Sequence, residues 1–280
     1  MHLIDIGANL THESFQHDLQ AVLERARTAG VERILVTGAS RSGSVEAQQL
    51  AVEHPGFLYA TAGLHPHHAH EYDAELDALL RSLLAHDEVL AVGETGLDYH
   101  RDFSPRDAQR FAFEQQLAIA MEVQKPLFLH QRDAHADFIA ILDAVRERLP
   151  PVVVHCFTGE RQELIDCLDR GFHIGITGWI CDERRGQHLR ELVRLIPADR
   201  LMIETDAPYL LPRTLKPKPS HRRNEPAFLA HICEEIARDR NEAPAITAAN
   251  STATAKRFFR LSDTGSPAAA SRQATCSPRC

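Results

Sequence analysis

Short apolar runs alternate with longer amphipathic stretches along most of the chain. The apolar runs are of strand length and carry hydrophobic residues at consecutive positions, which is typical of strands buried on both faces. They cover residues 3–6, 33–37, 58–62, 89–92, 126–129, 152–154, 172–176 and 201–203. Between them, the spacing of hydrophobic residues predicts helices over residues 14–29, 44–53, 74–85, 105–123, 134–149, 161–170 and 183–196.

Strict alternation of buried strands with amphipathic helices predicts a parallel sheet that is covered by helices. Eight such units in a chain of this length match a (β/α)8 TIM barrel. The alternative is a doubly wound open sheet, but the turn after the first strand lacks the glycine-rich spacing of a nucleotide-binding loop. We therefore expect residues 1–261 to form a single barrel domain.

The C-terminal part of the chain departs from this alternation. Residues 210–226 are rich in proline, which predicts a long loop after the eighth strand. Helical patterns over residues 227–238 and 245–259 follow it. Residues 262–280 are rich in Ser, Ala, Pro and Gly and offer little to bury, so we expect a disordered tail there.

Four of the predicted strands are followed by a residue that can bind a metal ion. These residues are Glu94, His130, His155 and Asp206. We expect Gly93 to end the strand over residues 89–92, so that Glu94 stands at a turn. Barrel active sites are built at the carboxyl ends of the strands, so these side chains should converge. Imidazole and carboxylate are the usual ligands of divalent cations, and the pattern predicts a metal site. The alternative is four unrelated structural residues.

Composition narrows the class of protein further. The chain is 44% hydrophobic and 25% charged, and no apolar run is long enough to cross a membrane. The N-terminus lacks the basic and apolar regions of a signal peptide, and the six cysteines have no regular spacing, so we expect a reduced, cytoplasmic protein. A net charge of −8 argues against general coating of nucleic acid but allows a local basic groove.

Seven segments, in this order, resemble the TatD family of metal-dependent deoxyribonucleases: DIGANL, GLHPH, GETGLDY, HQRDA, HCFTG, GITGW and ETDAPYL. The resemblance implies an amidohydrolase-like (β/α)8 metallohydrolase that cuts phosphodiester bonds. The segments KPKPSHRRNEP and CDERRG resemble bacterial members in particular, which implies a 3′–5′ exonuclease on single-stranded DNA, or RNA, with a role in DNA repair or degradation. By this resemblance the metal ligands are Glu94, His130, His155 and Asp206.

The first strand departs from the wider family pattern. Most relatives carry His-x-His there, whereas this chain has Gly7 and Asn9. The change removes two nitrogen ligands and favours Mg²⁺, with Mn²⁺ as the second choice. Asn9 is either a metal or phosphate contact or a turn residue.

Further residues near the strand ends have two interpretations each. His65 follows the third strand and is predicted to contact metal or phosphate, although a lone histidine there is often structural. Asp98 either orients a ligand imidazole or caps its loop. His67, His68 and His70 are expected at the surface or behind the ligands.

Substrate contacts are expected from loops after strands five, seven and eight. Arginine suits phosphate binding, and Trp179 or Tyr209 offers a ring on which an unpaired base can stack, although each of these side chains is alternatively solvated or packed. The basic residues on these loops are Arg132, Arg184, Arg185, Lys216, Lys218, Arg222 and Arg223.

The predicted reaction is metal-assisted phosphodiester hydrolysis by a monomer acting on single-stranded nucleic acid. Asp206 is the preferred general base, and Glu94 holds the ion. Cys156 is excluded as a nucleophile because nothing in the adjacent sequence would lower its pKa. Two alternatives stay open: an amidohydrolase or esterase acting on a small molecule, and a non-catalytic nucleic-acid-binding module.

Overall fold

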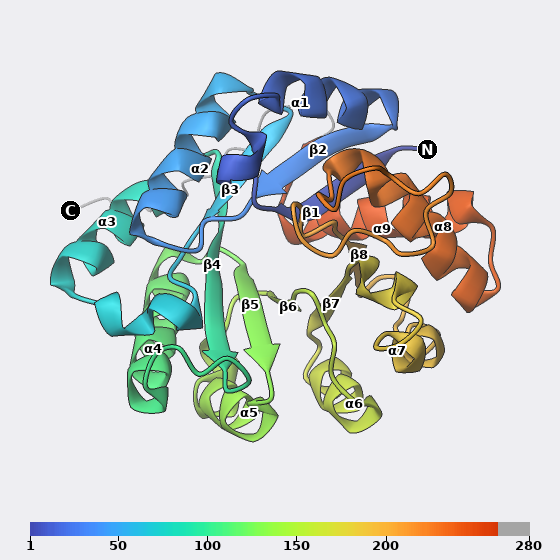
Figure 1. Cartoon of the computed structure of the whole chain (residues 1–280). Coiled ribbons are helices and arrows are strands. Elements are labelled where there is room, and N and C mark those ends of the chain that lie inside the picture. The colour runs from blue at the N-terminus through green and yellow to red at the C-terminus, as the bar shows by residue number, and fades with distance from the viewer. Residues whose placement is uncertain (263–280) are drawn as a thin grey trace, which may run out of the picture.

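Eight parallel strands follow one another around a barrel in chain order, and the last strand returns to the first (Figure 1). The computed structural model describes residues 1–262. Beside the isolated parallel bridge between Ala8 and Ala207, Asp206 N donates to Gly7 O at 2.8 Å and Asn9 N donates to Ala207 O at 2.7 Å. These bonds close the ring, so the predicted TIM barrel is confirmed over the open sheet.

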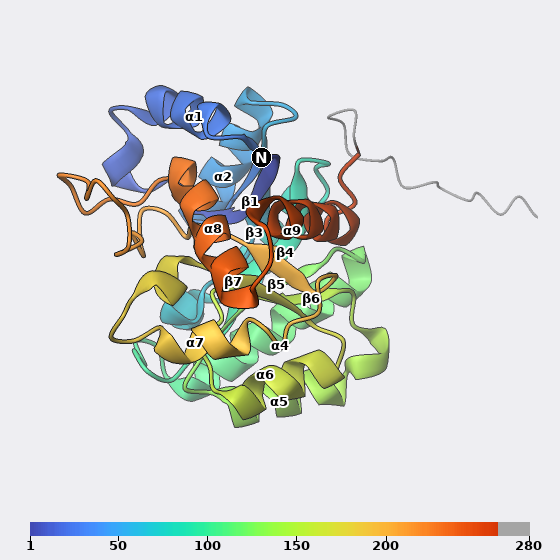
Figure 2. The ribbon, with the colours of Figure 1, turned by 90° about the vertical axis from the view of Figure 1, so that its right-hand side faces the viewer.

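The helices lie around the outside of the strands (Figures 1 and 2). The strands are β1 (Leu3–Ala8), β2 (Val31–Val36), β3 (Leu58–Ala62), β4 (Val89–Asp98), β5 (Leu127–Arg132), β6 (Val152–Val154), β7 (His173–Ile176) and β8 (Leu201–Ile203). The α-helices are α1 (Leu19–Thr28), α2 (Arg41–Glu53), α3 (Ala74–Leu84), α4 (Arg106–Val123), α5 (His135–Ala144), α6 (Arg161–Asp169), α7 (Gln187–Leu192), α8 (Leu229–Arg240) and α9 (Pro244–Phe258). Short 3-10 turns are η1 (Glu13–Phe15), η2 (Pro66–Glu71), η3 (Arg146–Arg148), η4 (Gly178–Cys181) and η5 (Pro226–Phe228).

The hydrophobic residues form two clusters that fix which end of the barrel is open. One cluster lies between the strands and the surrounding helices. The other fills the barrel interior, where residues such as Ile4, Tyr59 and Met202 pack with Phe258 and Phe259 at the end of α9. Helix α9 therefore closes the end at which the strands begin, and the site lies at the opposite end.

Strand β4 is longer than predicted. Gly93 does not end it, and Glu94 does not stand at a turn, because the strand continues to Asp98. Gly93 and Gly96 have φ of 141° and 143°, a region that disfavours side chains. A Cβ at Gly93 would overlap Phe128 O, so glycine lets β5 approach closely and the ladder continues past these positions.

Three predicted helices are shorter than the hydrophobic pattern suggested. The stretch 14–29 is divided into η1 and α1, and Asp18 between them pairs with Arg223 from the distant loop. Helix α5 ends at Ala144, and the 3-10 turn η3 follows within the predicted stretch before Pro150 restricts Leu149 to an extended conformation. Helix α7 begins at Gln187, because Asp182 accepts hydrogen bonds from the next turn and holds it outside the helix.

Residues 210–225 form the predicted loop between β8 and α8, and this loop projects beside α1 (Figure 2). Within residues 1–262, no helix has the length and hydropathy that crossing a membrane requires. Of the predicted disordered tail, residues 263–280 lie outside the described residues.

Candidate active site

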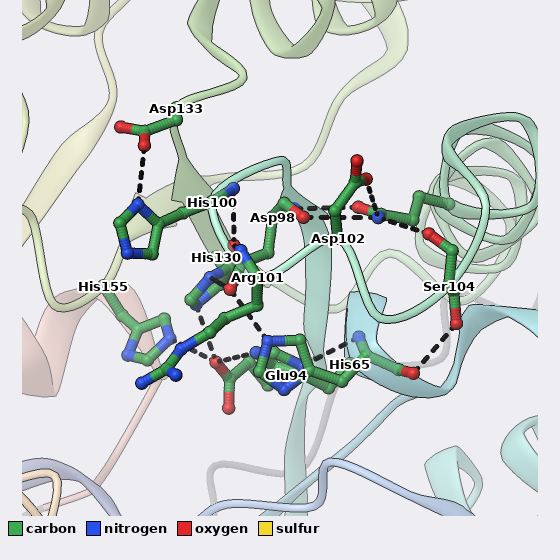
Figure 3. A network of polar contacts seen from close by, with 12 residues as sticks. His65, Glu94, Asp98, His100, Arg101, Asp102, Ser104, His130, Asp133 and His155 are labelled. Atoms are coloured by element: carbon green, nitrogen blue, oxygen red, sulfur yellow. Dashed lines mark hydrogen bonds and ion pairs between the residues drawn. The ribbon is translucent and has the colours of Figure 1, made fainter.

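Three imidazoles converge on one carboxylate oxygen at the open end of the barrel. Glu94 Oε1 lies 2.8 Å from His155 Nε2, 3.1 Å from His130 Nδ1 and 3.3 Å from His65 Nε2 (Figure 3). Glu94 and His155 are buried. The atoms of His65, Glu94 and His130 are close enough together to hold one ion. His155, after β6, lies outside this three-residue group. The four residues come from β4, from β5 and from just after β3 and β6, as the alternation of strands predicted for Glu94, His130 and His155.

A carboxylate layer supports the imidazoles from behind. Asp98 Oδ2 lies 3.3 Å from His130 Nε2 and 2.8 Å from His67 Nε2. His130 faces Glu94 through Nδ1 and Asp98 through Nε2, so the two carboxylates together orient the ring. Asp98 matches both predicted roles, because its Oδ1 also accepts hydrogen bonds from His100 N and Arg101 N in the following loop. Of the two positions expected for His67, the structure has the one behind the ligands.

Buried Glu204 is a second supporting carboxylate, which the sequence interpretation missed. Its Oε1 accepts a 2.6 Å hydrogen bond from Cys156 N, and its Oε2 lies 3.4 Å from His155 Nδ1. Gly7 and Gly175 leave the space that this side chain occupies, since a Cβ at either would overlap its carboxylate. A carboxylate that directly follows a buried strand, opposite two glycines on other strands, was the available signal.

Neighbouring charges lower the pKa of Glu94 and raise that of His155. Burial alone would raise the pKa of Glu94, but His155, His65 and His130 hold it well below its usual range. Burial likewise opposes protonation of His155, yet the carboxylates of Glu94 and Glu204 raise its pKa well above the usual value. Burial lowers the pKa of His65 to about 4, so this ring is neutral at pH 7, as a metal ligand must be.

Asp206 lies in the same cavity, but its carboxylate is outside the three-residue cluster. Asn9 Nδ2 donates a 2.9 Å hydrogen bond to Asp206 Oδ1. Burial and the nearby carboxylates of Glu94 and Glu204 together raise the pKa of Asp206 to about 8, against the opposing effects of His155 and of the Asn9 hydrogen bond. A bound cation would favour the ionised form. Asn9 therefore positions Asp206 and also begins a turn, since its backbone oxygen accepts a 3.0 Å hydrogen bond from His12 N.

The thiol of Cys156 also faces this cavity. Burial, together with the nearby Asp206 and Glu204 carboxylates, raises its pKa well above the usual value. The thiolate is therefore scarce at neutral pH, which agrees with its exclusion as a nucleophile.

The cluster forms the floor of a cavity of about 670 Å³ whose walls carry arginines. Four of its lining residues are Arg101, Arg132, Arg185 and Arg222, which come from the loops or strand ends after β4, β5, β7 and β8. Trp179 lines the wall between two of them, with the guanidinium carbon of Arg185 4.4 Å and that of Arg132 5.7 Å from its ring centroid. Tyr209 lines the cavity as well.

Four of the predicted basic contacts do not line this cavity. Arg184, Lys216 and Lys218 are absent from its wall. Arg223 forms two 2.7 Å hydrogen bonds with the carboxylate of Asp18 and one with a backbone carbonyl. Arg101, in contrast, was missed, because the sequence interpretation took basic residues only from the loops after strands five, seven and eight.

Comparison with known proteins places this arrangement in a family. The family model described as TatD related DNase matches residues 4–260. The chain belongs to the TatD-related DNase family. The chain is 51% identical over 259 residues to a protein of Pantoea vagans named 3′-5′ ssDNA/RNA exonuclease TatD, which covers 92% of this chain and 100% of that protein. This membership confirms the resemblance seen in the seven sequence segments.

Two further comparisons agree with this membership in the TatD-related family. A Rahnella protein with the same name is 53% identical over 260 residues, covering 93% of this chain and 99% of that protein. The crystal structure of YJJV, a TatD homolog from Escherichia coli, superposes with a TM-score of 0.84 at 27% identity and covers 93% of this chain and 98% of that chain. The barrel found here is therefore the family's fold.

Proposed function

We propose that this protein is a divalent-metal-dependent exonuclease that removes nucleotides from the 3′ end of single-stranded DNA or RNA. One observation carries the proposal: Glu94 and three imidazoles lie on the floor of a cavity whose walls carry four arginines. The carboxylate and imidazoles on the floor are typical ligands of a divalent cation, and the arginines on the walls can bind the phosphates of a nucleic-acid strand. The names of the Pantoea and Rahnella relatives support the polarity and the substrate.

The donor set fits a divalent ion. The carboxylate of Glu94 and the nitrogens of His65 and His130 lie close enough together to bind one ion, and His155 Nε2 lies 2.8 Å from the same Glu94 oxygen. Asp98 and Glu204 contact the His130 and His155 rings on their other sides. Such an ion supplies positive charge that polarises a phosphoryl oxygen and makes water more acidic.

The identity of the ion follows from the balance of nitrogen and oxygen donors. The argument for Mg²⁺ counted the nitrogens lost at Gly7 and Asn9, but His65 restores one of them beside Glu94. Imidazole-rich sites favour transition metals over Mg²⁺. We therefore propose that Mn²⁺ supports activity at least as well as Mg²⁺.

Asp206 is the proposed general base. Asn9 Nδ2 occupies its Oδ1, which leaves Oδ2 to accept the proton of the attacking water. The guanidinium groups of Arg132 and Arg222 on the cavity wall hold the strand and offset the charge that builds on the phosphate. Arg223 is excluded from this role because Asp18 already binds it.

The test is digestion of end-labelled single strands after chelation, with Mg²⁺ or Mn²⁺ added back. A 3′–5′ exonuclease converts a 5′-labelled strand into a ladder and releases a 3′ label at once as a mononucleotide. Glu94→Ala should abolish both signals, whereas Glu114→Ala, which changes an exposed carboxylate on α4, should not. Full activity of the chelated, metal-free protein would overturn the proposal. Turnover of a lactone or amide with no turnover of strands would favour the small-molecule alternative.

The cytoplasmic location, the monomeric state and the role in DNA repair or degradation stay predictions.

A further inference from the structure

The loop between β4 and α4, residues 99–105, carries Arg101, one of the four arginines on the cavity wall, and Phe103, which the proposed function does not use. Arg101 lines the cavity, and within residues 1–262 its guanidinium has no salt bridge and no hydrogen bond. Phe103 is 65% exposed, more than any other large hydrophobic side chain in the same range. Within the described residues, the Arg101 guanidinium is therefore unpaired on the cavity wall, and the Phe103 ring, two residues further on, is open to solvent.

This loop is fixed rather than loose. Asp98 Oδ1 accepts a 2.8 Å hydrogen bond from Arg101 N, and Gln109 Nε2 donates to Asp98 O and to Ser104 O at 3.2 and 2.8 Å (Figure 3). Ser104 Oγ donates a further 2.8 Å hydrogen bond to the backbone of η2. Gln109 and Ser104 are buried. The backbone is therefore fixed on both sides of Phe103, at Arg101 and Ser104, while the phenyl ring is exposed to solvent.

The Phe103 ring continues an aromatic surface that begins inside the cavity. Its centroid lies 4.7 Å from that of the His67 ring, with the two planes tilted by 58°. His67 lines the cavity, and His65 follows with centroids 4.2 Å apart. The exposed face of Phe103 therefore lies beside the cavity, and an aromatic face of this kind suits a nucleobase.

We propose that residues 99–105 form a nucleotide subsite in which Phe103 stacks on an unpaired base and Arg101 contacts an adjacent phosphate. The inference rests on the proposed function and specifies its substrate. A paired base in a duplex is already covered by its stacked neighbours, so stacking on Phe103 requires an unpaired base or one drawn out of the helix. The subsite therefore favours single strands.

The experiment combines Phe103→Ala with a set of oligonucleotides that lack one base at successive positions. Binding is measured by fluorescence anisotropy with Ca²⁺ in place of Mg²⁺, so that affinity is observed apart from turnover. Phe103→Ala should weaken binding of the intact strand about tenfold, because stacking on one aromatic ring accounts for an effect of that size. For the strand that lacks the base held by Phe103, the wild type should lose the same factor and Phe103→Ala should lose nothing more.

Three further variants serve as controls. Phe103→Trp keeps a stacking face and should restore affinity. Phe111→Ala removes another exposed phenyl ring, 51% exposed on α4 and in contact with Tyr72, and should bind normally. Arg101→Ala should weaken binding of all strands alike and reduce the salt dependence of affinity by about one phosphate contact.

The outcomes separate this inference from the proposed function. If the wild type digests strands but Phe103→Ala binds every oligonucleotide as the wild type does, the subsite is wrong and the exonuclease proposal stands. An equal loss on all strands, abasic positions included, would also overturn it. If the loss is confined to one base but no strand is ever digested, the subsite stands and the exonuclease proposal fails.

Discussion

The side-chain amide of Asn9, just after β1, donates a 2.9 Å hydrogen bond to Asp206 Oδ1, just after β8. The two residues lie 197 positions apart in sequence and meet because the barrel closes there. Asn9 thus binds the proposed general base through its side-chain amide. This contact leaves one carboxylate oxygen of Asp206 free to accept a proton.

Asn9→Ala should lower kcat about tenfold and leave KM nearly unchanged, because the hydrogen bond orients Asp206 and does not hold the strand. Asp206→Asn removes the proton acceptor itself and should cost on the order of a hundredfold or more. Both rates are measured on one labelled oligonucleotide in Mn²⁺. If Asn9→Ala cleaves as fast as the wild type, Asp206 does not depend on this contact. A rise in KM alone would assign Asn9 to substrate binding.

Arg222 and Arg223 are neighbours in sequence with different surroundings. Arg222 is exposed on the cavity wall, whereas Arg223 pairs with Asp18 and lies over the ring of Phe15. Arg222→Ala should weaken strand binding and reduce its salt slope by about one, with normal stability. Arg223→Ala should lower the free energy of unfolding by about 1 kcal/mol with little effect on binding.

Each of these two variants is the control for the other, measured by anisotropy at several salt concentrations and by urea denaturation. A strand-binding defect confined to Arg223→Ala would show that the loop rearranges around the substrate.

The arrangement of the site was predictable where it depends on strands. Consecutive apolar residues mark buried strands, and barrel topology brings their carboxyl ends together, so the amino-acid pattern alone was enough to place Glu94, His130 and His155 on one face. The roles of Glu204 and Arg223 could not be assigned, because both depend on which distant side chain lies opposite. Nothing in the adjacent sequence distinguishes Arg222 from Arg223, or shows that Gly7 leaves room for a carboxylate from β8's end.

The same limit explains the errors in element length. Glycine usually interrupts a strand, and Gly93 was therefore expected to end β4. The close approach of β5 makes glycine necessary at that position instead. The local pattern of apolar residues predicts that a strand or helix is present, whereas its contacts with other elements determine the residue at which it ends.

Gly7→Ala should be strongly destabilising, because the added Cβ would overlap Glu204 Oε2 and lie 3.0 Å from Phe128 Cζ. Glu204 is fully buried and bonded to Cys156 N, so it cannot move aside. We expect a loss of about 1–3 kcal/mol or more, measured by urea denaturation. In the double variant Gly7→Ala with Glu204→Ala the overlap is gone, and the combined loss should be smaller than the sum of the two single losses. Simple additivity would show that the space at Gly7 does not depend on Glu204.

His173, at the start of β7, should make stability depend on pH at the closed end of the barrel. Burial, with Arg200 nearby, lowers the pKa of His173 to about 4 from its ordinary value of 6.5, and its Nδ1 is buried without a partner. Between these two values the unfolded chain binds a proton that the folded chain refuses. Stability is therefore lost as pH falls from 6.5 to 4 and is unaffected by this group above that window.

The variant His173→Phe keeps an aromatic ring against Phe258 and removes the titrating imidazole. Between pH 7 and pH 5 the wild type should lose on the order of 1 kcal/mol more than the variant in urea denaturation, allowing for partial exposure of the ring. His86→Asn, at an exposed position, is the matched control and should follow the wild type. The carboxylates and histidines of the active site are present in all three proteins, so their contributions cancel when the pH dependence of the unfolding free energy is compared between wild type and variant. Parallel pH profiles for the wild type and His173→Phe would show that His173 accepts its proton in the folded state.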